Sequence, residues 1–340
     1  MKKTLSIMLC AFALLAAPAF ADVAITGEFT YGFNTSADAY ESVIDTGDLV
    51  VTGSTENASV VYGMDFTKVA AGLDDDATND LMSVDFISDL YMKMDLTGAM
   101  GIETPVSVSF KTGRTSFDAQ NYLGDIMGYE TYDVIDAETA TSTFLGFTFN
   151  IMDLFNVDYA IDPNLVDGVK EMFAGAYGTF AFVDAEAYYN ISEANYDAFG
   201  FDFVAHLDGF VPMDKLNFGA GAEYDMDNEL TRYGASAGAE MAGFYFGTGL
   251  AGFYADAADQ LGLGFDTSYA VTEAFKVYGA FMMKDLSDVS SDTTGYEVSA
   301  SYTFDGAVTA YAGYATAGTG YNALGDLTED SFFMAVSTAF

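Results

Sequence analysis

The sequence is poor in the residues that make disulfides, bends and basic surfaces. Its 340 residues include one cysteine, four prolines, one histidine and no tryptophan, with 11 lysines and arginines against 51 acids. The single cysteine lies at position 10, so the fold cannot rest on disulfides within the chain. A net charge of −40 makes nucleic acid a poor partner, because its phosphates would be repelled.

Long apolar runs are also missing after the first 20 residues. No later uncharged stretch approaches the roughly 18 residues that a membrane-spanning helix needs. Nevertheless 51% of the residues are hydrophobic, and charged residues make up only 18%, below the roughly 25% of a typical soluble protein. An aromatic content of 16% argues against disorder. The apolar residues must therefore be distributed in a pattern other than a spanning helix.

The N-terminus has the pattern of a secretory signal. Two lysines precede an apolar core over residues 5–15, and Ala19-Phe20-Ala21 forms a small-x-small cleavage site. This pattern predicts a cleaved signal peptide over residues 1–21 and one mature domain over residues 22–340. Cleavage would remove the cysteine and both lysines, leaving nine basic residues.

The mature chain consists largely of segments of about ten residues in which apolar residues occupy every second position. This alternation, interrupted by turn residues, is typical of strands in membrane β-barrels. A soluble sandwich would also alternate, but here the polar face is rich in Gly, Ser, Asp and Glu, as a wet lumen would be. Clear examples are residues 23–33, 84–96, 199–207, 216–226 and 296–304.

The spacing of the segments predicts about 18 strands. The weakest predictions are 48–53 and 155–161, and without them the count is 16. Either number leaves an aqueous channel inside the barrel. Short turns such as 242–243 and 305–306 alternate with longer polar loops such as 287–294 and 316–330, which predicts one short-turn end and one long-loop end.

The C-terminal segment resembles the last strand of bacterial outer-membrane barrels. Residues on one face are apolar at every second position and the chain ends in an aromatic residue. In those barrels this segment is read by the assembly machinery, although an ordinary C-terminal strand would show the same alternation. The residues of this assembly signal are Phe332, Met334, Val336 and Phe340.

A second resemblance concerns residues 106–114, which end in Lys-Thr-Gly-Arg. This segment resembles the strand before the inward-folded third loop of general diffusion porins, and the break at 115–141 would be the third outer loop. The resemblance implies an all-β fold, a transmembrane antiparallel β-barrel of 16–18 strands with an inward-folded third loop, placed in the bacterial outer membrane. It also implies a homotrimer.

In that family, acidic residues of the folded loop face basic residues of the wall. The same arrangement would produce a transverse field here, but alternation alone would also turn basic residues inward, since lipid-facing Lys or Arg costs about 2–4 kcal/mol at the midplane. The predicted loop acids are Asp118, Asp125, Glu130, Asp133, Asp136 and Glu138, and the inward basic residues are Lys93, Lys111, Arg232 and Lys276.

Acidic residues outnumber basic residues on the predicted inner face. Rings of Asp and Glu favour cations, which predicts a cation-preferring channel. Adaptation to salty surroundings would also account for part of the acidity. The predicted wall acids are Asp85, Asp89, Asp95, Asp202, Glu223, Glu240 and Glu297, with Asp266 as a further inward candidate.

The sequence offers little for catalysis or cofactor binding. Outer-membrane hydrolases need histidine beside Asp or Ser, and His206 is the only histidine. The acidic run 74–76 lacks the glycine and the final glutamate of a calcium loop, so we expect no metal site and no cofactor.

The sequence thus predicts a water-filled outer-membrane channel for passive diffusion of small hydrophilic solutes and ions, not an enzyme. Its partners would be outer-membrane lipid, the barrel-assembly machinery and two further copies of the chain. The alternative is a structural or adhesive barrel whose acidic loops bind partners or divalent cations.

Overall fold

The computed structural model contains one antiparallel sheet of 18 strands within the residues that it describes. These residues are 22–35, 40–65, 88–123, 135, 138–139, 142–164, 168–193, 195–255, 258–287, 294–304, 308–316 and 330–339. The strands are β1 (Asp22–Thr35), β2 (Tyr40–Ser54), β3 (Ala58–Asp65), β4 (Asp89–Asp95), β5 (Val106–Thr115), β6 (Ser142–Ile151), β7 (Phe155–Ile161), β8 (Glu171–Phe180), β9 (Val183–Ser192), β10 (Ala198–His206), β11 (Lys215–Asp225), β12 (Leu230–Met241), β13 (Phe244–Ala255), β14 (Ala258–Ala270), β15 (Phe275–Met283), β16 (Thr294–Phe304), β17 (Val308–Ala315) and β18 (Ser331–Ala339).

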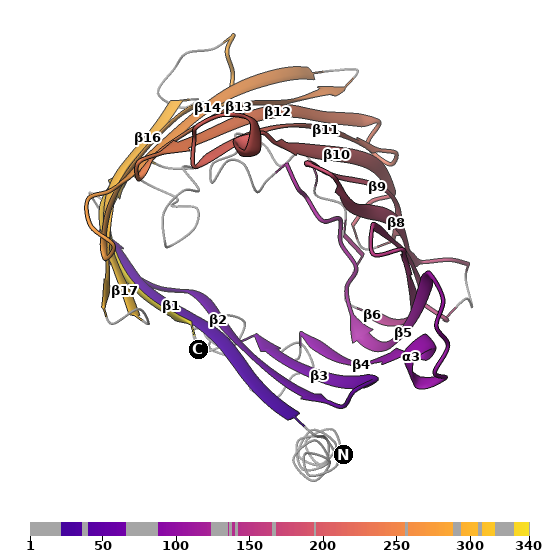
Figure 1. Ribbon diagram of the computed structural model, residues 1–340. Coiled ribbons are helices and arrows are strands. Elements are labelled where there is room, and N and C mark those ends of the chain that lie inside the picture. The colour runs from indigo at the N-terminus through magenta and orange to yellow at the C-terminus, as the bar shows by residue number, and fades with distance from the viewer. Residues whose placement is uncertain are drawn as a thin grey trace, which may run out of the picture.

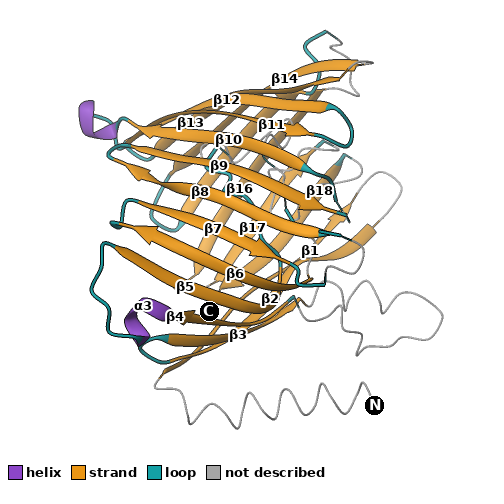
Figure 2. Cartoon of the chain, turned by 90° about the vertical axis from the view of Figure 1, so that its right-hand side faces the viewer, coloured by secondary structure: helices purple, strands orange, loops and turns teal. Residues whose placement is uncertain are grey.

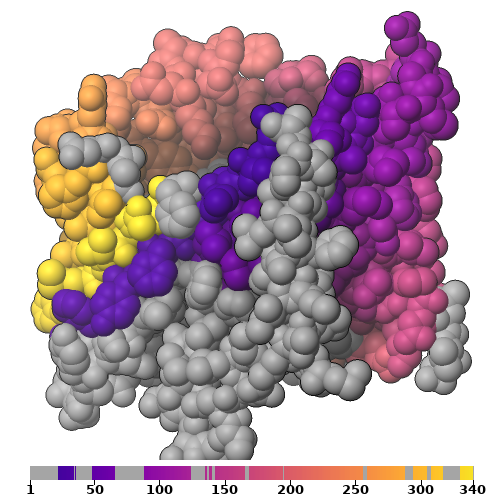
Figure 3. All heavy atoms as spheres, turned by 90° about the horizontal axis from the view of Figure 1, so that it is seen from below, coloured from indigo at the N-terminus to yellow at the C-terminus, as the bar shows by residue number. Residues whose placement is uncertain are grey.

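The sheet closes on itself. Each strand pairs with the next in the chain, and β1 pairs with both β2 and β18, so that Tyr31 lies opposite Val336. The strands form a ring in Figure 1, and Figure 3 shows β1 running beside the yellow β18. The count is 18 because β7 is a separate strand and residues 48–53 belong to β2.

Alternation along the strands separates an apolar outer face from an inner face rich in polar residues. In β10, Phe199, Phe201 and Phe203 are 50%, 53% and 39% exposed, whereas the intervening Gly200 and Asp202 are buried on the other face. Because side chains of a strand alternate between the two faces, the period-two pattern predicted this division correctly.

The two ends of the barrel differ in their connections. Tight turns such as 242–243, where Ala242 and Gly243 have φ of 52° and 77°, lie at one end, since residues with positive φ match the twist of a hairpin. The helical turns α3 (Leu96–Ala99) and η3 (Asp208–Phe210) also lie at this end, as Figure 2 shows. The connection 116–141 belongs to the opposite end.

Strand β4 ends one residue earlier than its alternation predicted. The side chain of Asp95 accepts a hydrogen bond from the backbone N–H of Gly98 at 3.0 Å, which caps α3 and turns Leu96 out of the strand. No helix in the described part of the chain is long and apolar enough to cross a membrane. Residues 1–21, the turn 305–306, and most of the loops 287–294 and 316–330 lie outside the described residues.

Candidate functional site

The connection between β5 and β6 folds into the barrel. Its described part packs on inward-facing side chains of the wall far along the sequence, and Figure 1 shows this segment inside the ring of strands. It is the third connection at the long-loop end, so the predicted inward-folded third loop is confirmed. The buried contact contains Leu123 and Ile135 of the loop with Phe173 of β8, Tyr188 of β9, Ala198 of β10 and Ala251 of β13.

The described residues of the loop form two limbs, a first limb over residues 116–123 and a second limb that contains residues 135 and 138–139. Two carboxylates of the wall hold the first limb. The backbone N–H groups of Gln120 and Asn121 donate to Glu186 Oε2 and Oε1 at 2.8 and 2.7 Å, and that of Leu123 donates to Asp202 Oδ2 at 2.6 Å. Glu186 and Asp202 lie directly opposite each other on β9 and β10, where like charges would repel. Donors from the loop offset this repulsion, and we call these two residues the latch pair.

The second limb of the loop pairs with the first. Phe117 and Thr139 exchange hydrogen bonds at 2.8 Å, the N–H of Phe117 donating to Thr139 Oγ1 and the N–H of Thr139 to the carbonyl of Phe117. The carbonyl of Glu138 accepts from the side-chain amides of Asn190 and Asn195, each at 3.1 Å. Both limbs are therefore anchored to the same side of the barrel wall.

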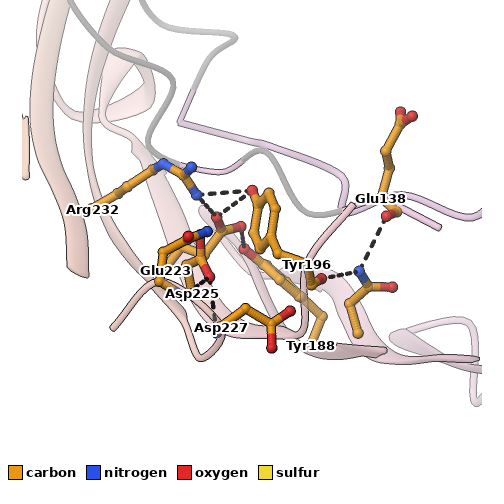
Figure 4. Close-up of polar contacts among 9 residues, drawn as sticks. Glu138, Tyr188, Tyr196, Glu223, Asp225, Asp227 and Arg232 are labelled. Carbon is orange, nitrogen blue, oxygen red and sulfur yellow. Dashed lines mark hydrogen bonds and ion pairs between the residues drawn. The ribbon is translucent and has the colours of Figure 1, made fainter. Parts of the chain in front are cut away.

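A buried ion pair lies beside this anchor. The side chain of Glu223 on β11 is 0% exposed and contacts Arg232 Nη1 on β12 at 2.6 Å. The hydroxyls of Tyr188 and Tyr196 also donate to Glu223, and the guanidinium of Arg232 lies 4.9 Å from the centre of the Tyr196 ring. Figure 4 shows the four side chains converging. Since Tyr188 also packs on the loop, this tetrad joins the wall to the loop.

Lys111 lies at the base of the loop. Its Nζ is 4.1 Å from the centre of the Tyr91 ring and 4.6 Å from that of Phe117, and it donates to Thr115 Oγ1 at 3.1 Å. The hydroxyl of Thr115 donates in turn to Asp89 Oδ1 at 2.8 Å. Lys111 thus lies against the loop that folds into the barrel.

The two predicted loop acids that the structure describes are close together and exposed. Asp118 and Glu138 face each other in an isolated bridge between the limbs. In Figure 4 the carboxylate of Glu138 points away from the wall. Although Asp118 is exposed, partial desolvation by the loop and wall raises the pKa of its carboxyl, and the positive charge of Lys111 opposes this shift.

The other predicted wall residues lie at several heights in the barrel. Lys93 pairs with Lys111 across β4 and β5, Lys276 lies opposite Ser301, and Glu240 lies opposite Lys215. Glu297 is buried on β16. The predicted residues that lie outside the described part are Asp85, Asp125, Glu130, Asp133, Asp136 and Phe340.

Sequence reasoning missed three residues that hold the loop, Glu186, Tyr188 and Tyr196. The first two lie on one face of β9, where alternate residues over 183–192 are polar or aromatic, and this pattern was a usable signal. Tyr196 lies in the connection between β9 and β10 and follows no pattern.

The described residues include no group of three or more His, Cys, Asp or Glu side chains that could hold a metal ion. His206 contacts Asp184 Oδ2 through Nε2 at 2.7 Å and Asn217 Oδ1 through Nδ1 at 3.1 Å. Both ring nitrogens are thus engaged by wall side chains.

Comparison with known proteins gives similarity in structure alone. No family model matches the chain, and no curated protein matches it. Among solved structures, Pseudomonas aeruginosa OpdL superposes with a TM-score of 0.55 at 9% identity, covering 94% of this chain and 99% of that one. P. aeruginosa OccK11 (OpdR) gives 0.51 at 7% identity, covering 94% of each chain. A mutant of the Rh. blastica porin gives 0.50 at 16%, covering 94% of this chain and all of that one. The chain therefore has the barrel fold of the porins.

Proposed function

We propose that this chain is an outer-membrane porin, a water-filled channel through which ions and small hydrophilic solutes diffuse passively with a preference for cations. The observation that carries the proposal is the described part of the loop 116–141, which is docked inside a closed barrel and exposes Asp118 and Glu138. A loop held inside the lumen narrows the path, and its exposed acids set the charge that a passing ion meets.

The charges near the loop support a preference for cations. Arg232 is paired with Glu223, and Lys111 is covered by two aromatic rings, so both positive charges are partly screened from the lumen. Asp118 and Glu138 are exposed instead, and carboxylates that line a narrow passage favour cations. We propose no reaction and no cofactor.

Ion selectivity tests this function. In planar bilayers under a salt gradient, we expect the reversal potential to show cation preference, and we expect Asp118→Asn with Glu138→Gln to lower the cation-to-anion permeability ratio about twofold or more. The matched control is Asp153→Asn, an exposed acid in a tight turn at the short-turn end, which should leave the ratio unchanged. Absence of conductance would refute the channel, and anion preference would refute the selectivity.

The same experiment extends to the loop acids predicted from the sequence. Asp125, Glu130 and Asp133 lie outside the described residues, and their role in the constriction stays a prediction. Neutralising these three residues together should lower the cation-to-anion permeability ratio further.

If the barrel spans a membrane, the free-energy cost of placing a charged residue on its outer face should depend on the depth of that residue in the bilayer. Phe201 lies within β10 and Phe304 ends β16, and their exposed fractions are 53% and 52%. Replacing Phe201 with Arg should lower the free energy of unfolding by about 2–4 kcal/mol, because it places a charge in hydrocarbon, whereas Phe304→Arg near the interface should cost about 0–1 kcal/mol. Urea titration of the barrel in lipid vesicles measures both costs, and equal costs would argue against a membrane-embedded belt.

Export and assembly complete the proposal. The segment 1–21 would be removed on export. Phe332, Met334 and Val336 are exposed on the outer face of β18, where the assembly machinery could read them together with Phe340. We also propose a homotrimer, which chemical cross-linking of the folded protein would detect as a species of three subunits.

A further inference from the structure

Hydroxyl groups take the place of carboxylates on the lumen side of β15, β16 and β17 near the short-turn end. These three strands contain one acidic residue, Glu297, which lies toward the long-loop end, and one basic residue, Lys276. Tyr302 of β16 and Phe281 of β15 are 45% and 41% exposed on the outer face, so alternation turns the residues of opposite parity inward. We call the following inward residues the hydroxyl patch: Tyr278, Ser301, Thr303, Thr309 and Tyr311.

Side-chain contacts place the members of the hydroxyl patch together. The hydroxyls of Tyr278 and Ser301 share a hydrogen bond at 3.1 Å, and those of Thr303 and Thr309 share one at 3.0 Å. Tyr311 of β17 lies directly opposite Ser301 of β16. The phenols of Tyr278 and Tyr311 are also electrostatic neighbours. The two tyrosines therefore flank Ser301, one from β15 and one from β17.

Water reaches the hydroxyl patch. The side chains of Tyr278, Thr303, Thr309 and Tyr311 are half-buried and that of Lys276, at the border of the patch, is exposed, whereas Glu297 further along β16 is buried. Figure 1 shows β16 and β17 on the opposite side of the ring from β8 and β9, where the loop 116–141 is anchored. A solute in the lumen can thus meet the rings and the hydroxyls together.

The chemistry of the hydroxyl patch matches that of a neutral sugar. A hydroxyl group has one donor and two acceptor lone pairs, so clustered hydroxyls can bond to the hydroxyls of a sugar in either direction. The ring of a tyrosine is an apolar surface with a polar tip, and the C–H face of a pyranose is apolar as well. No member of the patch is charged. Lys276 adds donors at the border, but the net charge of −40 disfavours an anionic ligand.

We propose that the hydroxyl patch binds neutral saccharides on the inner wall of the barrel. The rings of Tyr278 and Tyr311 stack on the sugar, and the hydroxyls around Ser301 bond to it. The patch contacts one side of the ligand and water covers the other, so the dissociation constant should be on the order of 1–10 mM. The role of this site rests on the proposed channel function, because a sugar meets the inner wall only when solutes enter the lumen.

Saturation-transfer difference NMR tests the site with maltose as the probe. The sample is the refolded barrel in lauryldimethylamine oxide, a detergent without a sugar group, and we expect maltose C–H signals that saturate with concentration. Tyr278→Ala and Tyr311→Ala should each raise the half-saturating maltose concentration about threefold or more. Tyr302→Ala is the matched control, because it removes a tyrosine of β16 from the outer face and should leave this concentration unchanged.

A milder variant and a second probe sharpen the test. Tyr278→Phe keeps the ring but loses the bond to Ser301, and it should raise the half-saturating maltose concentration about twofold or more even if the alanine variants do not refold. Glycine betaine, a small zwitterion without hydroxyl groups, should give no saturable signal. Folding of each variant is checked by its heat-modifiable migration on gels.

Three results would overturn the proposal. They are the absence of a saturable maltose signal in the wild type, a half-saturating concentration that the substitutions of Tyr278 and Tyr311 leave unchanged, and a saturable signal from glycine betaine equal to that from maltose. The NMR measurement does not depend on conductance. A barrel that conducts ions without binding maltose therefore rejects the sugar site alone, and one that binds maltose without conducting rejects the channel alone.

Discussion

Replacing both latch residues, Glu186→Gln with Asp202→Asn, should release the first limb of the loop while the barrel stays folded. The backbone N–H groups of Gln120, Asn121 and Leu123 lose charged acceptors, and such hydrogen bonds contribute about 1.5–3 kcal/mol each. A side-chain amide keeps one acceptor oxygen, but its NH₂ group would face a backbone donor. The variant therefore loses part of the free energy that holds the loop against the wall, while all strands of the barrel stay in place.

Hydrogen exchange measures the release directly. We expect the amides of residues 120, 121 and 123 to exchange about a hundredfold faster, which corresponds to about 2.8 kcal/mol at 1.4 kcal/mol per tenfold change. If the barrel is the proposed channel, single-channel recordings should also show larger current fluctuations, because a loosened loop varies the width of the passage.

Asp225→Asn is the control for the latch. This carboxylate is as buried as Asp202 and also accepts backbone N–H groups, but those belong to the connection between β11 and β12. Its replacement should leave exchange at residues 120–123 unchanged. Equal exchange in the latch variant and the wild type would show that the apolar contacts of Leu123 and Ile135 hold the loop by themselves.

Much of the fold follows from the sequence because each strand has one face toward an apolar environment and the other toward an aqueous one. Alternation in 199–207 and 216–226 gave both the strand and its inner face, and the hairpin between 216–226 and the following strand sets Glu223 opposite Arg232. The boundary at Asp95 escaped prediction, because a single side-chain cap ended a strand whose alternation continues through Leu96.

The site was less predictable than the barrel that carries it. Loop acids and inward basic residues can be found from spacing, but the partners of Glu186 and Asp202 are backbone N–H groups, which leave no mark in the side-chain pattern. Their contacts join residues more than 60 positions apart, and only the path of the loop brings them together. Alternation predicts that Asp202 lies on the inner wall, but its hydrogen bond to the backbone of Leu123 could not be predicted from the sequence of β10.

The tetrad gives the second large expected effect. Arg232→Met should lower the free energy of unfolding by about 3–5 kcal/mol, because it leaves Glu223 buried without its counter-ion. The hydroxyls of Tyr188 and Tyr196 still donate to the carboxylate, which places the cost toward the lower figure. Urea titration of the refolded barrel in lipid vesicles gives the value.

Two further variants distinguish the destabilisation caused by an unpaired buried charge from that caused by removing a basic side chain. Glu223→Gln combined with Arg232→Met should be about 1–2 kcal/mol more stable than Arg232→Met alone, since a neutral amide needs no counter-ion. Lys170→Met removes a solvent-exposed ion pair with Glu193 and should cost less than about 1 kcal/mol. If Arg232→Met costs no more than Lys170→Met, the ion pair does not anchor this side of the wall, and the aromatic packing of Tyr188 on the loop must account for its position.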